Sequence, residues 1–263
     1  MLVHPESAGG AAMQRLEVRL DWGDEERRVG LLAERDGRVY FEHDAEFLDA
    51  ALPISPFKLP ARPGLLEHDD REFGGIFGVF ADSLPDGWGL LLMDRTFRKR
   101  GLDPARVSVL DRLAYIGTRG MGALVYHPPT DDAEAEGPAV DLRELARQAE
   151  RILNGSVEEV LPALRIAGGS PAGARPKVLV AIHEDGRAIA GTSDAPPGFR
   201  HHVVKFPGRE DLPEIGAVEA AYAVMAREAG VNVPPTTLLE TADGGRYFAA
   251  ERFARPRAPD PGS

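Results

Sequence analysis

The second half of the chain places strand-like and helix-like patterns in an order that strongly limits the possible folds. Residues 177–191 and 236–255 alternate apolar and polar side chains around turn signals, which predicts two hairpins. A short strand at 201–208 and a helix at 213–230 lie between them. This order predicts an antiparallel sheet with one helix packed on a face, and the α+β class for this half.

The first half is also rich in predicted strands. Residues 14–22 and 26–44 alternate in polarity, and an Asp36-Gly37 pair marks a tight turn, so we expect a hairpin or meander. A turn then leads into a helix from about Trp88 to Lys99. The sequence therefore predicts a β-rich N-terminal subdomain with short helices.

A change in composition separates the two halves. The stretch 128–139 is acidic and rich in proline and alanine, which is typical of a linker or mobile loop. The predicted organisation is a disordered tail at 1–12, a subdomain at 13–128, a linker at 129–140, a second domain at 141–255 and a tail at 256–263.

Composition excludes several classes of protein. The chain has 263 residues and no cysteine, so disulfides and thiolate metal sites are excluded and a cytoplasmic setting is expected. The N-terminus has no secretory pattern, and no apolar run is long enough to cross a membrane. A net charge of −11 argues against direct binding to nucleic acid.

A glycine-rich loop at 165–182 runs into an apolar strand and is the first candidate for a phosphate site. Gly168 and Gly173 have the Walker separation, but Ala174 stands where that motif needs lysine, and no Rossmann fingerprint is present. A small-residue loop followed by a strand is instead the layout of a kinase loop that covers phosphates. By itself, however, the pattern favours an ordinary surface loop.

Lysine is rare enough in this chain to be informative. Lys and Arg together number 31, and only four are lysines: Lys58, Lys99, Lys177 and Lys205. Lys205 lies inside an apolar strand, where it either contacts a ligand's phosphates or protects a sheet edge from aggregation. Both alternatives remain open from the strand alone.

Glu219 favours the ligand alternative. The helix carries an apolar stripe that we expect to be buried: Ile215, Val218, Tyr222, Met225 and Ala229. Glu219 lies within or beside this stripe, and a half-buried carboxylate needs a partner, for which Lys205 is the natural candidate. The alternative is a solvated glutamate at the rim of the helix face. A strand lysine paired with a helix glutamate is how protein kinases hold ATP.

These segments together resemble one known family. The ordered set "FADSLPDGWGLLLMDR", "RGMGALVYHP", "GGSPAGARPKVLV", "HHVVKFP", "VEAAYAVMAREAGVNVPPT" and "RYFAAERFAR" is similar to HipA-like serine/threonine kinases, the toxins of type II toxin–antitoxin modules. The resemblance runs from about Met13 to Arg255 and implies that the second domain is a kinase-like N-lobe.

The resemblance implies roles for particular residues. Ser170 would be the autophosphorylated serine, the loop from Ser170 to Lys177 would cover the phosphates of ATP, Lys205 would contact those phosphates and Glu219 would orient Lys205. Glu251 and Phe253 would offer backbone groups to adenine. The implied set for ATP is Ser170, Ala172, Gly173, Ala174, Arg175, Lys177, Lys205, Glu219, Glu251 and Phe253.

Two departures from the family limit the expected activity. Ala254 replaces an acid of the family's "RFDR" motif, and no catalytic or metal-binding aspartate of a second lobe follows Arg255. We therefore expect a chain truncated or split before its catalytic lobe, without catalytic or metal-binding residues of its own. On this reading it binds ATP and Mg²⁺ weakly and does not phosphorylate proteins alone.

The resemblance also implies partners. A helix-turn-helix antitoxin binds members of the family, and the full kinase phosphorylates an aminoacyl-tRNA synthetase or a translation factor. A separate chain that supplies the catalytic lobe is a further expected partner. The alternative function is a non-enzymatic regulator that pairs with such a lobe or with an antitoxin.

Overall fold

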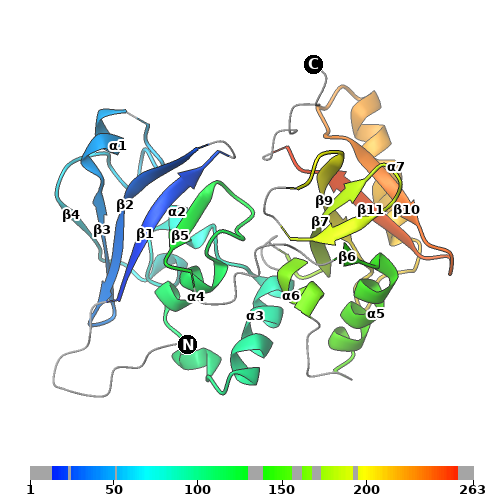
Figure 1. Ribbon diagram of the computed structural model, residues 1–263, viewed down its shortest axis with the longest axis horizontal. Coiled ribbons are helices and arrows are strands. Elements are labelled where there is room, and N and C mark those ends of the chain that lie inside the picture. Colours follow the sequence, from blue (N-terminus) through cyan, green and yellow to red (C-terminus); the bar gives the residue numbers. More distant parts are fainter. Residues whose placement is uncertain are drawn as a thin grey trace. The chain divides into compact units, whose positions relative to one another are not determined.

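The computed structural model describes residues 14–22, 25–50, 52–129, 139–155, 162–167, 173–191 and 195–253. The chain is α+β and has two antiparallel sheets (Figure 1). It divides into two compact units: unit 1 is Met1–Leu84 with Ala105–Glu134, and unit 2 is Pro85–Pro104 with Ala135–Ser263. The sequence placed residues 85–104 in the first domain, whereas in the structure they belong to unit 2.

Unit 1 is built on a five-stranded sheet of order β4-β3-β2-β1-β5. The Asp36-Gly37 turn joins β2 to β3 with positive φ at both residues, as a tight hairpin turn requires. Ser108 and Asp111 cap α4 reciprocally. The elements are β1 (Gln14–Asp21), β2 (Glu26–Arg35), β3 (Arg38–His43), α1 (Ala45–Asp49), β4 (Leu65–His68), η1 (Glu72–Gly74), α2 (Gly78–Ala81), η2 (Pro104–Arg106), α4 (Val109–Ile116) and β5 (Leu124–His127).

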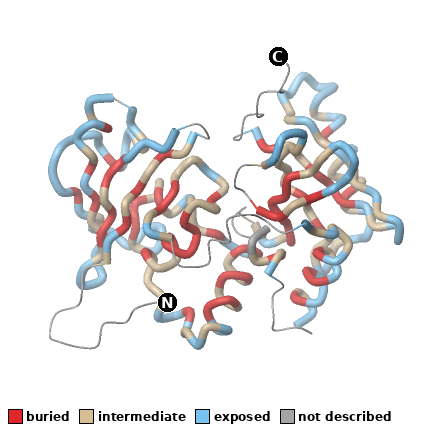
Figure 2. Tube along the Cα trace, in the orientation of Figure 1, coloured by how far each residue is buried: buried red, intermediate tan, exposed pale blue. Residues whose placement is uncertain are grey.

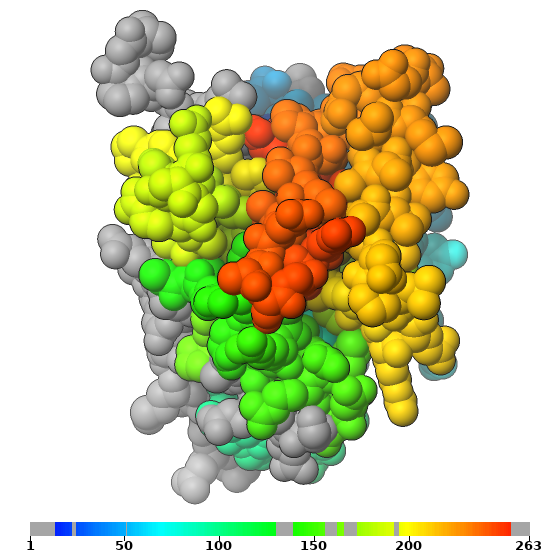
Figure 3. Space-filling model, turned by 90° about the vertical axis from the view of Figure 1, so that its right-hand side faces the viewer, coloured from blue at the N-terminus to red at the C-terminus, as the bar shows by residue number. Residues whose placement is uncertain are grey.

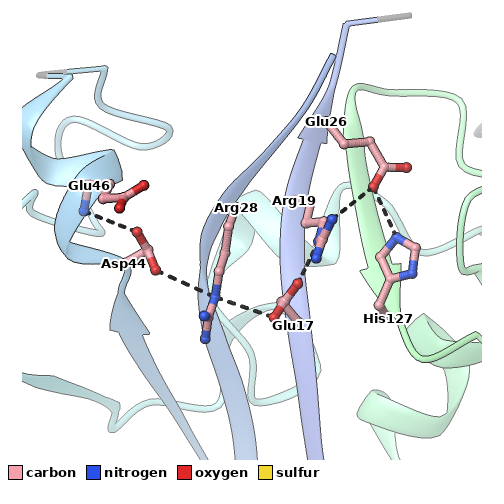
Figure 4. Close-up of polar contacts among 7 residues, drawn as sticks. All are labelled: Glu17, Arg19, Glu26, Arg28, Asp44, Glu46 and His127. Atoms are coloured by element: carbon pink, nitrogen blue, oxygen red, sulfur yellow. Dashed lines mark hydrogen bonds and ion pairs between the residues drawn. The ribbon is translucent and has the colours of Figure 1, made fainter. Parts of the chain in front are cut away.

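The two faces of the unit 1 sheet differ. Alternate residues of β1, such as Leu16 and Val18, are buried in an aromatic-rich core. On the opposite face of the sheet, charged side chains of β1, β2 and β5 form a row (Figure 4). In this row Arg19 and Arg28 both contact Glu17. Because these side chains are partly exposed and alternate in sign, we interpret the row as a solvated face.

Unit 2 is built on a six-stranded antiparallel sheet of order β10-β11-β9-β7-β8-β6. A turn at Asp185-Gly186 joins β7 to β8, as the sequence predicted. The elements are α3 (Gly87–Lys99), β6 (Ala139–Val140), α5 (Leu142–Leu153), α6 (Pro162–Ala167), β7 (Lys177–His183), β8 (Ala188–Ala190), β9 (Phe199–Lys205), α7 (Ile215–Glu228), β10 (Thr236–Glu240) and β11 (Arg246–Glu251).

Helices cover both faces of the unit 2 sheet, so the prediction of one packed helix was incomplete. Residues of α3, α5 and α6 pack with Val178, Val204 and Ala249 in one buried core. α7 packs against β10 and β11 and meets the other face, where its Glu219 contacts Lys205. Figure 2 shows buried residues along β7, the central strand between these layers.

The face of α7 that meets the sheet differs from the predicted face. Gly216 and Ala223 are the buried residues of the helix, and a Cβ on Gly216 would lie 2.3 Å from the Arg246 carbonyl oxygen. Of the stripe predicted to be buried, Tyr222 is 66% and Met225 62% exposed. Small residues let the helix backbone approach β11 closely, and this contact turns the larger apolar side chains outward.

Candidate functional site

Three side chains form a row across the middle of the unit 2 sheet. Lys205 of β9 lies opposite Lys177 of β7 on one side and opposite Phe248 of β11 on the other. Directly opposed residues of antiparallel strands point to the same face. The Lys205 ammonium lies 5.3 Å from the centre of the Phe248 ring. Two cations and an aromatic ring therefore share the face that α7 meets.

Glu219 of α7 supplies the counter-charge. Its Oε2 lies 2.7 Å from Lys205 Nζ, and its Oε1 accepts a hydrogen bond from Arg175 Nη1. The Glu219 side chain is 20% exposed, and both of its oxygens have a cationic partner. The ion pair predicted between Lys205 and Glu219 is present, and it is shared with Arg175.

Asp211 is a site residue that the sequence did not reveal. Arg175 contacts it through two nitrogens, with Nε 2.7 Å from Oδ2 and Nη2 3.0 Å from Oδ1. Asp211 also accepts the Gly208 N–H at 2.7 Å. The guanidinium is thus held between two carboxylates, which makes Arg175 a brace between β7 and α7. The one sequence signal was an aspartate three residues after a loop glycine.

Lys177 is the most enclosed cation of the row. It is 7% exposed, and burial lowers its pKa by disfavouring the charged form, with the Lys205 ammonium adding repulsion. The Asp86 and Glu219 carboxylates oppose this shift of the Lys177 pKa. A Cβ on Gly173 would lie 2.8 Å from Lys177 Nζ, so the end of the glycine loop rests on this lysine.

A turn ahead of α3 holds the end of the glycine loop, and the sequence did not predict this contact. The Gly173 N–H donates to Asp86 Oδ1, and the Gly173 carbonyl accepts the Trp88 N–H at 3.2 Å. The Trp88 indole donates to the Lys177 carbonyl at 3.0 Å. Residues almost ninety positions apart in the sequence therefore meet at one point of unit 2.

The other predicted site residues are less closely associated. Ser170 and Ala172 lie outside the described residues. Ala174 is exposed beside Gly173. Glu251 lies three residues along β11 from Phe248, about 10 Å away, and its N–H donates to the Pro235 carbonyl at 2.8 Å. Phe253 is 89% exposed, so its side chain lies outside the core of unit 2.

Unit 2 also has a pocket of about 520 Å³ on another side of the sheet. It is lined by α5, by residues 206–213 and by the hairpin loop at 243–247. Figure 3 looks onto this side, with the orange-red hairpin above the green α5. Phe206 and Tyr247 at the pocket belong to the core beneath α5, so the pocket is separate from the row of Lys177, Lys205 and Phe248.

The site offers cations for an anionic ligand. Within the described ranges, no group of three or more His, Cys, Asp or Glu side chains could hold a metal ion. Within the same residues, no helix is both long and apolar enough to span a membrane. On this face of unit 2, the polar groups are the ammonium groups of Lys177 and Lys205 and the Glu219 carboxylate, which binds Lys205 and Arg175. The Gly173 backbone, held by Asp86 and Trp88, lies beside them.

The fold and the site define an α+β protein of two units. Its second unit holds a strand lysine against a helix glutamate, beside a glycine whose N–H and carbonyl both have partners. Comparison with family models identifies the family: a HipA N-terminal domain matches residues 20–127, and a HipA-like C-terminal domain matches residues 169–260. The chain therefore belongs to the HipA-like family. No curated protein matches it.

The C-terminal match corrects one expectation. The sequence suggested that only the N-terminal part of the family is represented and that the C-terminal lobe is absent, yet residues 169–260 match the C-terminal domain. The match begins in the glycine loop. The sheet that holds Lys205 and the helix that holds Glu219 thus belong to the C-terminal domain of the family.

Proposed function

We propose that this HipA-like chain is the toxin of a type II toxin–antitoxin module and that unit 2 holds the nucleotide of a serine/threonine kinase. The observation that carries the proposal is the Lys205–Glu219 ion pair, at 2.7 Å, on a sheet face that Lys177 shares. A strand lysine oriented by a helix glutamate is how protein kinases hold the phosphates of ATP.

The residues fit the phosphates of a nucleotide. Two lysines point to one face, and Lys205 is 36% exposed, so a ligand has access to its ammonium. In this proposal Lys205 contacts the phosphates, Glu219 orients it, and the loop from Ser170 to Lys177 covers the ligand. Arg175 was an expected phosphate contact, but its bonds to Glu219 and Asp211 support a bracing role instead.

The proposal extends to the metal and the adenine of ATP. ATP would bring Mg²⁺, which neutralises developing charge during phosphoryl transfer, but the described residues supply no metal-binding cluster. Backbone groups of Glu251 and Phe253 would meet the adenine. The Glu251 N–H donates to the Pro235 carbonyl.

The partners follow from the same proposal. The helix-turn-helix antitoxin would bind this chain, and the phosphorylated target would be an aminoacyl-tRNA synthetase or a translation factor. Ser170 would be the site of autophosphorylation.

Isothermal titration calorimetry with ATP, with and without Mg²⁺, tests the nucleotide site. The wild-type chain is expected to bind with a dissociation constant on the order of 0.1 mM, and Lys205→Ala to weaken binding at least about tenfold. Lys99→Ala removes another unit 2 lysine, on the exposed end of α3, and is the matched control. Equal affinity of the Lys205 and Lys99 variants, or no binding by the wild type, would contradict the site.

Phosphoryl transfer needs a separate measurement. Because the described residues supply no metal-binding cluster, intact-mass and peptide mass spectrometry after incubation with ATP and Mg²⁺ is expected to find no phosphate on Ser170 of the chain alone. Addition of a separate chain that supplies the catalytic lobe should produce phosphate on Ser170, and Ser170→Ala and Lys205→Ala should each abolish that signal. If the mixture binds ATP but Ser170 gains no phosphate, the nucleotide site stands and the kinase assignment fails.

One observation favours a second candidate, a non-enzymatic regulator that pairs with an antitoxin or a separate kinase lobe. α7 exposes Val218, Tyr222 and Met225, apolar side chains that a partner could cover. Both functions predict association with a helix-turn-helix antitoxin, so co-purification with such an antitoxin is combined with the ATP-binding measurement to distinguish them. Association that Tyr222→Ser abolishes, in a chain that binds no ATP, would favour the regulator.

A further inference from the structure

Asp86 occupies a position at which aspartate usually caps a helix, but its side chain does something else. It is the N-cap residue of α3, where a carboxylate commonly accepts an N–H of the first helical turn. No such bond is present, and Asp86 Oδ1 instead accepts the N–H of Gly173, 87 residues away. The Asp86 carboxylate therefore does not cap α3 and instead binds the backbone of a segment that is distant in the sequence.

The neighbours of Asp86 complete the hold on Gly173. The Trp88 N–H donates to the Gly173 carbonyl at 3.2 Å, so both backbone polar groups of Gly173 have partners in one turn. Gly87 makes this approach possible, because a Cβ there would lie 2.7 Å from the Gly173 carbonyl oxygen. The φ of Gly87 is +43°, a left-handed value that side chains rarely adopt.

The turn at residues 86–88, called the clamp below, also contacts Lys177 of the site. Asp86 attracts the buried Lys177 ammonium, and the Trp88 indole binds the Lys177 carbonyl. Trp88 is 1% exposed and packs in the unit 2 core, so this core anchors the turn. The turn at residues 86–88 thereby holds both Gly173 and Lys177, the first residue of β7.

We propose that Asp86 is a positioning residue for Gly173. It fixes the Gly173 backbone beside Lys177, so that this backbone keeps its place next to phosphates held by Lys205. The inference rests on the proposed function for the role of the phosphates, but the fixing of Gly173 stands without a nucleotide. Residues 85–104 then serve the ligand unit, although the N-terminal domain match includes them.

Hydrogen exchange of the full chain without nucleotide tests the clamp itself. In Asp86→Ala, the Gly173 amide is expected to exchange about tenfold faster, because its acceptor is lost. Asp86→Asn retains a carbonyl acceptor and should keep most of the protection. Asp49→Ala, an exposed aspartate of α1 in unit 1, is the matched control and should leave Gly173 unchanged. Unchanged exchange in Asp86→Ala would overturn the proposal.

ATP affinity tests the consequence. Asp86→Ala should bind ATP about five- to tenfold more weakly, while Asp86→Asn should stay within about twofold of the wild type. Tighter binding by Asp86→Asn would overturn positioning, since it would mean that the carboxylate competes with phosphate for the Gly173 N–H. If no variant binds ATP, the proposed function fails, whereas the exchange result still decides the clamp.

Discussion

Lys205 Nζ and Glu219 Oε2 are 2.7 Å apart and join β9 to α7 in the middle of unit 2. Glu219 also accepts from Arg175, which in turn contacts Asp211. Removing one member of this network therefore has different consequences depending on which member is lost.

Glu219→Gln should destabilise unit 2 more than Lys205→Met does. Loss of the carboxylate leaves Lys205 and Arg175 without their shared counter-charge, and Lys177 lies beside them. We expect a loss of about 1–3 kcal/mol in unfolding free energy for Glu219→Gln. For Lys205→Met, whose side chain is 36% exposed, the loss should be under about 1 kcal/mol. Urea denaturation measures both, and the reverse order would contradict the shared-anion geometry.

A double-mutant cycle provides the control for that comparison. Lys205→Ala and Glu219→Ala should couple by about 0.5–1 kcal/mol. Arg147 and Asp243 form an ion pair at 3.1 Å, but both side chains are exposed. Their coupling should be near zero, about 0–0.3 kcal/mol. Equal couplings would show that the position of the pair beneath α7 has no energetic consequence.

Gly216→Ala should destabilise the chain, against the usual preference of helices for alanine. The added Cβ would lie 2.3 Å from the Arg246 carbonyl oxygen, and neither backbone can yield without moving α7 off β11. We expect a loss of about 2 kcal/mol or more in unfolding free energy. Gly122→Ala has no atom within 4 Å of the new Cβ and is the control. A stabilised Gly216→Ala would disprove the close helix–sheet contact.

Polar substitutions of the outward stripe of α7 should have little effect on stability. Tyr222→Ser and Met225→Ser alter side chains that are more than half exposed, so each should change unfolding free energy by less than about 0.5 kcal/mol. Ala223→Leu enlarges the buried face of the same helix and should cost about 1–3 kcal/mol. A loss above about 2 kcal/mol from Tyr222→Ser would mean that the stripe is covered in solution.

Glu34→Gln in unit 1 should stabilise the chain at neutral pH. Burial raises the pKa of the Glu34 carboxyl, with Asp111 adding repulsion and Ser108 opposing through a hydrogen bond. The folded state then holds a proton that the unfolded state has released, so stability falls as pH rises above the ordinary value of 4.5. At pH 7 the glutamine should raise the melting temperature by about 2 °C.

The same substitution has a built-in check. Below pH 4 the Glu34 carboxyl is mostly protonated in both states, so the difference between Glu34→Gln and wild type should disappear. Glu42→Gln, which alters an exposed residue of β3, should have no effect at either pH. A gain that persists at low pH would assign the effect to packing instead of charge.

The sequence by itself determined part of the secondary structure and one contact of the site. Period-two alternation marked β1 and β2, the Asp36-Gly37 turn marked the hairpin between β2 and β3, and the Lys205–Glu219 pair followed from a lysine in an apolar strand. These features are local or follow from the cost of burying a charge, so residue order contains them. The ordered motifs likewise indicated the HipA-like family before the domain matches did.

Tertiary structure decided which faces and segments meet. Helical periodicity places Gly216 and Tyr222 on two candidate faces of α7, and only the close approach to β11 turned the glycine inward. In the sequence, Asp86 is an ordinary turn residue, and only the tertiary structure shows that its carboxylate accepts the Gly173 N–H. Contacts across some ninety residues depend on how the α3 segment packs onto the sheet, and that packing energy comes from the whole core of unit 2, beyond any local pattern.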